Sequence, residues 1–308
     1  MFLHSLLIVT ASVVPLSSDV EISPTVRALV TRYGKTFGPD AERDLERLSL
    51  NGDRTAAALL GELLQFQNRA GGQDFAKSCN YSEAAGRHAS ALHNLATCYF
   101  NGTGRPRDLK RARDLYGQAA DMGFAKAACA LGNMLTAGTG GPAEPQRGVE
   151  LCKRAADTGL PDAQTDYAGY LLTNRFIAKD AVAARRYLSL AAAKGHPNAS
   201  FLLGQIYWNG DGIEKNTKEA AKWWSIAYNG GRLDAARLLG VAMLAQILPD
   251  IQSKRPIRVS DLEQARAWFA IAVEKDPDPA ERRKATEMLA NLKSFKPVAS
   301  DSNLPQRR

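Results

Sequence analysis

Residues 197–231 read PNASFLLGQIYWNGDGIEKNTKEAAKWWSIAYNGG and contain two short apolar-periodic segments with a Gly-rich turn between them. Apolar residues at helical spacing on either side of NGDG at 209–212 predict two helices joined by a tight turn. A glycine at position 231 closes the stretch, where a residue in the left-handed region ends a helix at low cost. The stretch therefore predicts one helix pair.

The same pattern recurs along most of the chain, at intervals of 35 or 36 residues. A small residue in each opening helix defines one register, and closing glycines define a second register with the same period. The small residues are Gly61, Ala96, Gly132, Ala168, Gly204 and Gly240, and the closing glycines are Gly123, Gly159, Gly195 and Gly231. Two registers in phase indicate stacked helix pairs, because one pair cannot bury its apolar face alone.

The small residues in the opening helices have a packing explanation. Glycine inside a helix costs about 1 kcal/mol relative to alanine, so Gly204 predicts that a second helix approaches closely. Trp224 occupies the large position of the second helix, where it is expected to fill the gap between helices. The alternative is an aromatic ligand cage formed with Trp223, but the periodicity favours packing for Trp224, with Trp223 partly exposed.

The distribution of apolar, polar, glycine and proline residues along the chain suggests five segments. We expect a signal peptide at 1–18, an N-terminal helical cap at 19–54 and repeats over 55–278, followed by a capping helix at 279–292 and a disordered tail at 293–308. The last repeat carries an insertion at 246–260. Asn216 with Glu219, and Ser260 with Glu263, are spaced as capping boxes that start second helices.

Residues 199–227 contain L-G-x-x-Y-x-x-G-x-G followed by the alanines and tryptophans of the second helix, and residues 91–120 and 127–156 match the same motif well. In this the chain resembles the Sel-1-like repeat family, which is related to tetratricopeptide repeats, over about residues 55–275. The resemblance implies an all-α fold, a right-handed α-solenoid of about six stacked helix pairs with a concave face. It also implies a protein-binding scaffold or adaptor.

Residues that vary between repeats are the candidates for recognition. They lie three positions before, or one position after, the small residue of each opening helix, where a groove would receive a partner protein or peptide. The predicted binding residues are His93, Thr97, Asn133, Thr165, Phe201, Gln205 and Arg237. We expect Phe201 to act as an apolar anchor and Arg237 as a carboxylate clamp. The alternative is that these positions vary only because nothing constrains them.

The chain is basic, with 40 Lys and Arg against 32 Asp and Glu and a net charge of +8. Binding of a polyanion through a basic surface is therefore one alternative function. The short basic clusters Lys254-Arg255, Arg282-Arg283-Lys284 and Arg307-Arg308 have no aromatic residues interleaved with them. Because a single-stranded nucleic acid needs such a stacking platform, we expect no specific nucleic acid as a partner.

The apolar stretch from Leu3 to Leu16 is too short for a membrane span and suits the core of a secretory signal peptide. A secreted or periplasmic protein is therefore expected, most simply a monomer. The alternative is a cytoplasmic protein whose first segment is a buried helix or strand. In an exported chain the four cysteines Cys79, Cys98, Cys129 and Cys152 can form one or two disulfides; otherwise they are buried thiols.

Sequence motifs for catalysis are absent. There is no Gly-x-Ser-x-Gly, Walker loop or His-Glu-x-x-His, so we expect neither an enzyme nor a cofactor. The alternative enzyme is a secreted hydrolase of the cysteine-rich Sel-1-like type, although these cysteines do not recur with the repeat. His93 and Cys98 lie five residues apart on one helix and point in different directions, so a zinc site with Cys79 and His88 is disfavoured and no metal is expected.

Overall fold

The computed structural model describes residues 23–33, 38–66, 74–173, 175–253 and 257–294. It consists of two compact units, Met1–Ala155 and Ala156–Arg308, with the boundary in the last turn of a helix. All regular structure in the described residues is α-helical, which confirms the predicted all-α fold. The predicted signal peptide at 1–18 and almost all of the predicted tail at 293–308 lie outside the described residues.

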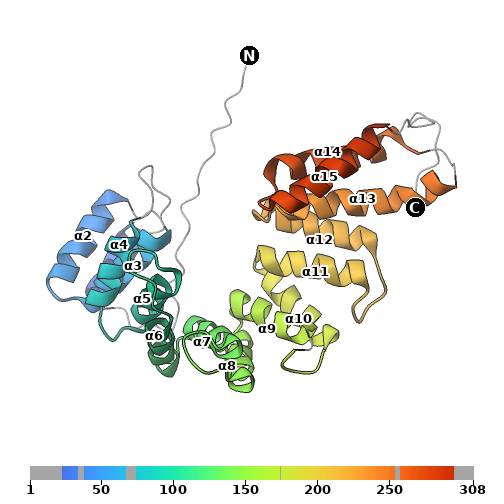
Figure 1. The fold of residues 1–308 in the computed structure, drawn as a ribbon. Helices are drawn as coiled ribbons and strands as arrows, with labels where there is room; N and C mark the ends of the chain where they lie inside the picture. Colours follow the sequence, from blue (N-terminus) through green and yellow to red (C-terminus); the bar gives the residue numbers. More distant parts are fainter. Residues whose placement is uncertain (1–22, 34–37, 67–73, 174, 254–256, 295–308) are drawn as a thin grey trace, which may run out of the picture. The chain divides into compact units, whose positions relative to one another are not determined.

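In each unit, successive helices lie side by side and contact one another (Figure 1). The helices of the first unit are α1 Pro24–Tyr33, α2 Pro39–Leu50, α3 Arg54–Phe66, α4 Phe75–Ala84, α5 Ala89–Asn101, α6 Leu109–Asp121, α7 Ala125–Ala137 and α8 Pro145–Asp157. Those of the second unit are α9 Pro161–Thr173, α10 Ala181–Ala193, α11 Pro197–Asn209, α12 Thr217–Asn229, α13 Ala235–Gln252, α14 Val259–Lys275 and α15 Pro279–Ser294.

The helix pairs follow the predicted repeat. The opening helices are the odd-numbered ones from α3 to α13, and each is followed by its second helix. The eight helices from α5 to α12 all have 13 residues, as expected if one packing solution is repeated. None of the helices in the described residues has the length and hydropathy needed to cross a membrane.

Glycines of the opening helices lie where a second helix comes closest. A Cβ at Gly204 would overlap the indole ring of Trp224, and one at Gly240 would lie 2.9 Å from the ring of Phe269. At Gly132 the obstacle is the backbone, since a Cβ there would lie 2.5 Å from the carbonyl oxygen of Gly148. Because real Cβ contacts are longer than this, each of these positions accepts only glycine without movement of the neighbouring helix.

The core is built from the facing sides of neighbouring helices. In the second unit, Trp224 is 1% exposed and Phe269 is fully buried, and each is surrounded by alanines of the same and neighbouring helices. Trp224 also donates a hydrogen bond from Nε1 to the main-chain oxygen of Phe201, at 3.2 Å. Trp223 is half-buried. Large side chains thus alternate with small ones, which allows close axial packing.

Of the two capping boxes predicted for second helices, one does not lie at the start of its helix. Asn216 accepts hydrogen bonds from the amides of Lys218 and Glu219, as a capping residue does. Ser260 does not start α14, which begins at Val259 with Arg258 in the capping position and no side-chain cap. The capping box predicted at Ser260 is therefore wrong, because the helix begins before it.

The predicted insertion at 246–260 is helical in its first half. Helix α13 continues to Gln252 and includes Pro249, so it is 18 residues long where the other opening helices have 13. Ile247 and Ile257, from the two ends of this segment, are buried with residues of α14 and α15. The extra residues therefore extend the apolar core of the last pairs.

The four cysteines form two disulfides. Cys79 of α4 is joined to Cys98 of α5, and Cys129 of α7 is joined to Cys152 of α8. The first links the second helix of one pair to the opening helix of the next, whereas the second links the two helices of one pair. The alternative of buried free thiols is therefore wrong, as is a zinc site that uses Cys79 and Cys98.

Candidate functional site

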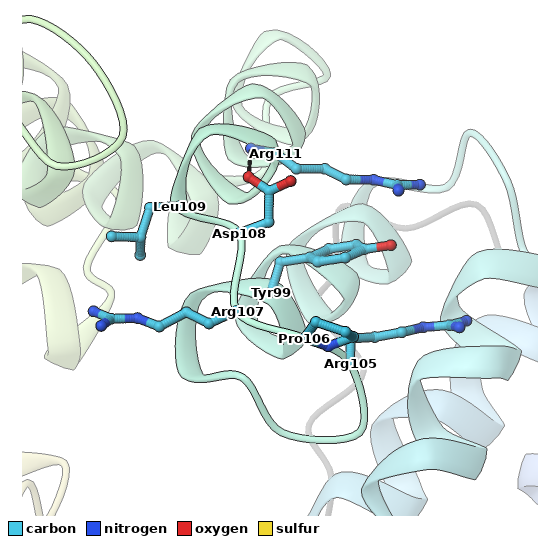
Figure 2. A pocket seen from close by; sticks show the side chains of 7 residues that line it. All are labelled: Tyr99, Arg105, Pro106, Arg107, Asp108, Leu109 and Arg111. Atoms are coloured by element: carbon cyan, nitrogen blue, oxygen red, sulfur yellow. Dashed lines mark hydrogen bonds between the residues drawn. The ribbon is translucent and has the colours of Figure 1, made fainter.

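A pocket lies at the turn between α5 and α6, within the first unit (Figure 2). Its volume is about 660 Å³, and three of its side chains are arginines. The lining residues are Tyr99, Arg105, Pro106, Arg107, Asp108, Leu109 and Arg111. Three guanidinium groups against one lining carboxylate make this a basic pocket.

Local backbone chemistry shapes the turn. Gly102 ends α5 in the left-handed region with φ 71°, and Gly104 follows with φ 69°. A Cβ at Gly104 would lie 2.5 Å from the carbonyl carbon of Phe75, so the turn packs directly on the start of α4. Asp108 then caps α6 by accepting a hydrogen bond from the amide of Arg111, at 2.9 Å.

The ring of Tyr99 separates two of the arginines. The guanidinium carbon of Arg111 lies 4.5 Å from the centre of this ring, within cation–π range. Figure 2 shows Arg105 on the other side of the ring, with its side chain running in the same direction as that of Arg111. Tyr99 is only 7% exposed, so its ring is a fixed partition rather than a mobile surface group.

The chain's own Glu83 approaches both of these arginines. Its carboxylate forms an ion pair with Nη2 of Arg105 and lies 3.8 Å from Nη2 of Arg111. Arg105 also donates a hydrogen bond to the side-chain oxygen of Asn80, at 2.9 Å. Arg105 is therefore held by α4, whereas the guanidinium of Arg111 makes no hydrogen bond to the described residues.

Arg107 runs the opposite way from Arg105 and Arg111 (Figure 2). It donates a hydrogen bond from Nε to the main-chain oxygen of Phe100, at 3.2 Å. Its two Nη groups have no partner among the described residues. The turn thus presents guanidinium donors on both sides of Pro106.

Most of the residues predicted to line a groove make contacts within the fold, which leaves less of their side chains exposed for a partner than expected. In the first unit, His93 is half-buried and packs its ring against Tyr116 and Phe124, with ring centres 5.3 and 5.4 Å apart. Thr97 lies 2.9 Å from the hydroxyl of Tyr116, while Asn133 is exposed on α7. His93 and Thr97 are close together, since Thr97 donates to the carbonyl oxygen of His93 at 3.0 Å.

In the second unit, Thr165 is 6% exposed and bonds the carbonyl oxygen of Pro161 at 2.8 Å. Its hydroxyl also lies 3.0 Å from Nδ1 of His196. Phe201 is half-buried beneath the guanidinium of Arg232, whose carbon is 4.1 Å from the ring centre. These contacts use the side chains to join one repeat to the next.

The two remaining predicted residues also lie partly buried. Gln205 is half-buried on α11, and Arg237 forms an ion pair with Glu281 of α15, with Nε and Oε2 2.6 Å apart. Phe201 and Arg237 are both more exposed than their neighbours Leu203 and Leu239, which are buried. The carboxylate clamp expected at Arg237 already holds a carboxylate of the chain itself.

Three of the predicted binding residues make contacts with the same spacing along the chain. His93, Thr165 and Phe201 each contact the residue 31 positions further along, which is just before the opening helix of the next pair. In these three repeats the position three before the small residue contacts a neighbour at the start of the next repeat, whereas Arg237, at the same position of α13, pairs with Glu281 of α15. Variation at this position does not by itself indicate recognition of another molecule.

The arginine-lined pocket was missed in the sequence, although a signal for it exists. Residues 105–113 read RPRDLKRAR, with five basic residues and one acidic residue in nine positions. Pro106, Leu109 and Ala112 interrupt the run, so it is less visible than adjacent pairs of basic residues. Its place directly after the turn glycines is what brings three of its arginines to one pocket.

The family model of the Sel1 repeat matches residues 89–124, 125–160, 161–196, 197–231 and 255–277, which is more than half of the chain. The first four matches begin where α5, α7, α9 and α11 begin. The chain therefore belongs to the Sel1 repeat family. Comparison with curated protein sequences gives no match.

Two solved structures show the same fold. A Sel1 repeat protein from Oxalobacter formigenes is 23% identical, with 83% of this chain and 94% of that chain covered and a TM-score of 0.59. The protective antigen c5321, present in uropathogenic Escherichia coli strains and displaying an SLR fold, is 21% identical, with 87% of this chain covered and a TM-score of 0.60. This chain covers 56% of that antigen.

Proposed function

We propose that the protein is a non-catalytic scaffold that binds a partner protein or peptide. The Sel1 repeat family, whose members generally serve as protein–protein interaction scaffolds, supports this proposal. The observation that carries it is the pocket at the α5–α6 turn, where Arg107 and Arg111 keep hydrogen-bond donors that the fold does not use. Exposed donors on a rigid turn are suited to recognition.

Many side chains outside this turn make contacts within the fold. Large and small side chains pack the helices together, and residues such as Thr165 and Phe201 join successive repeats. The turn between α5 and α6 differs in its side chains from the equivalent turn of the next repeat, which has Gly141 and Ala143 in place of Arg105 and Arg107. A scaffold built this way needs no reacting group, and the alternative of a secreted hydrolase would need one.

We also propose that the protein acts outside the cytoplasm, as a secreted or periplasmic monomer. Two disulfides support this, because disulfides persist in oxidising compartments and are rare in the cytosol. Mass spectrometry of the protein from its native host would show both disulfides and a shortened N-terminus. Reduced cysteines in a chain that retains Met1 would contradict the proposal.

The scaffold function is tested by chemical cross-linking of the full chain in its native compartment, followed by measurement of binary binding between the purified partners. A partner that binds the full chain with a Kd in the micromolar range or below is the expected result. Cross-links to no consistent partner, together with turnover of ester or amide substrates, would show that the scaffold function is wrong.

A further inference from the structure

We propose that the pocket at the α5–α6 turn binds an acidic peptide segment, with one carboxylate at Arg111, a second near Arg107 and an apolar side chain between them. The proposal rests on the scaffold function and adds to it the site and the chemistry of the partner. It is argued from the two arginine positions, from the apolar residues that also line the pocket, and from the absence of this arrangement in the next repeat.

Glu83 shows that a carboxylate fits beside Arg105 and Arg111. Its two oxygens divide between them, one paired with Arg105 and the other 3.8 Å from Arg111. The distance of 3.8 Å is too long for a hydrogen bond, so the N–H donors of Arg111 remain available to a partner. The guanidinium meanwhile rests on the ring of Tyr99, which holds it in place. A carboxylate from a partner would complete the coordination of Arg111 without displacing Glu83 from Arg105.

Arg107 supplies a second position for an anion. Its Nε is used by the carbonyl oxygen of Phe100, which fixes the side chain, while both Nη groups remain available. Arg107 and Arg111 extend in opposite directions from the turn (Figure 2). Two anion positions that face different ways fit spaced acidic side chains on an extended peptide better than a single compact phosphate.

The lining of the pocket is partly apolar. Pro106 is exposed and Leu109 is half-buried, and both line the pocket. A nucleic acid would need an accessible aromatic face for base stacking, but Tyr99 is 7% exposed and Arg111 covers one face of its ring. An apolar side chain next to a carboxylate matches this lining, and both occur together in peptides.

The next repeat has the same turn without the pocket chemistry. Thirty-six residues beyond Arg105 and Arg107 are Gly141 and Ala143. The position equivalent to Arg111 is Arg147, which pairs with Glu144 at 2.9 Å in its own turn. The repeat framework therefore does not require arginines at these positions, and Arg147 serves as a matched control for Arg111.

The test uses the full-length disulfide-bonded chain and three fluorescein-labelled probes. The first probe is a ten-residue peptide of alternating Glu and Leu, the second has Gln in place of Glu, and the third is a ten-nucleotide single-stranded DNA. Fluorescence anisotropy gives the Kd of each probe for the parent, for Arg107→Gln/Arg111→Gln and for Arg147→Gln. Thermal melts of all three proteins show whether the fold is retained.

We expect the acidic peptide to bind the parent and the Arg147→Gln variant equally, and the Arg107→Gln/Arg111→Gln variant about tenfold or more weakly. The Gln peptide should bind the parent at least tenfold more weakly than the acidic one. If the DNA binds more tightly than the acidic peptide, with a steep loss of affinity on addition of salt, the site is a polyanion site and the proposal is overturned.

Two further outcomes separate this proposal from the scaffold function. Equal binding of the acidic peptide to the parent and to the double variant would overturn the pocket while leaving peptide binding intact. If the acidic peptide does not bind but a native partner does bind the parent and the double variant with the same Kd, the pocket is again overturned and the scaffold function stands.

Discussion

The indole ring of Trp224 occupies the space that a side chain at Gly204 would fill. The two residues belong to the opening and second helices of one repeat, and the indole also donates a hydrogen bond to the carbonyl oxygen of Phe201 at 3.2 Å. The indole of Trp224 therefore limits how closely the two helices can approach at this point and links them by a hydrogen bond. The same relationship recurs between Gly240 and Phe269, with a different aromatic residue.

We predict that Gly204→Leu destabilises the protein by about 3 kcal/mol, and Gly204→Ala by about 1–3 kcal/mol, because the added atoms overlap Trp224. The matched control is Gly169→Ala in α9, where an added Cβ meets no atom within 4 Å. That change should be neutral or stabilising by up to about 1 kcal/mol, since alanine favours a helix. Denaturant unfolding monitored by circular dichroism gives the three free energies. Equal stability of the Gly204 and Gly169 variants would show that the helix contact is not as described.

Removal of Trp224 is a complementary change. Trp224→Ala should cost about 3–5 kcal/mol, because it leaves a cavity among alanines that cannot fill it. Trp224→Phe should cost less, since it keeps most of the volume and loses the hydrogen bond to Phe201. The same unfolding measurement applies, and a Trp224→Ala protein as stable as the parent would contradict the packing role of this side chain.

The disulfide between Cys79 and Cys98 should stabilise the junction between α4 and α5. Its cysteines are 19 residues apart, for which chain-entropy arguments give about 3 kcal/mol. We predict that a Cys79→Ala/Cys98→Ala variant unfolds at a correspondingly lower denaturant concentration. Peptide mapping without reduction should find Cys79 with Cys98 and Cys129 with Cys152. Any other pairing would contradict the helix register of the first unit.

His88 should make the stability depend on pH. Burial lowers the pKa of its imidazole below the ordinary value of 6.5, so the folded state keeps the ring neutral while the unfolded state takes up a proton. Stability contributed by the neutral ring is complete above pH 6.5 and is lost as the pH falls towards the folded-state pKa. We expect a His88→Gln variant to lose less stability than the parent over this range.

Melting temperatures of both proteins between about pH 5 and 8 test this linkage. Burial raises the pKa of Glu62, which acts in the opposite direction by favouring the folded state at lower pH. The comparison between parent and variant removes that contribution, since Glu62 is present in both. Parallel melting curves across the range would show that His88 titrates equally in the folded and unfolded states.

Arg237 should contribute to the stability of the fold, whereas its sequence position predicts a role only in binding a partner. The side chains of Arg237 and Glu281 are 22% and 23% exposed, and loss of Arg237 leaves the half-buried carboxylate of Glu281 paired with Lys284 alone. We expect Arg237→Ala to cost about 1 kcal/mol. The control is Arg283→Ala, which removes an equal charge from the exposed face of α15 and should have no measurable effect. Similar unfolding midpoints for the two variants would contradict the role of the ion pair.

The sequence predicted the repeat because its determinants are local to each helix pair. Spacing alone identified Gly204 and Trp224, since a small residue and a large one must recur in register wherever helices pack closely. The disulfide pairing was not predictable, because four cysteines allow three pairings and the choice depends on how neighbouring pairs stack. Contacts 31 residues apart, such as that of Thr165 with His196, depend on the same stacking.

The binding site was harder to predict for a physical reason. Variable positions in the opening helices can vary either for recognition or to match a neighbour in the next repeat, and the contact of Phe201 with Arg232 is of the second kind without excluding the first. The pocket at the α5–α6 turn instead depends on side chains that diverge from a short turn. A charge count over nine residues would have detected the basic run, but not the ring of Tyr99 that holds Arg111 in place.

The most direct test of the central claim is an NMR titration of the full chain, labelled with nitrogen-15 at arginine, with the alternating Glu and Leu peptide. Single Arg→Gln variants assign the side-chain Nε–H signals. We predict that the peptide shifts the signals of Arg107 and Arg111, and more weakly that of Arg105, while those of Arg147 and Arg237 stay in place. Shifts at Arg237 without shifts at Arg107 and Arg111, or no shift at any arginine, would contradict the claim that this turn is the binding site.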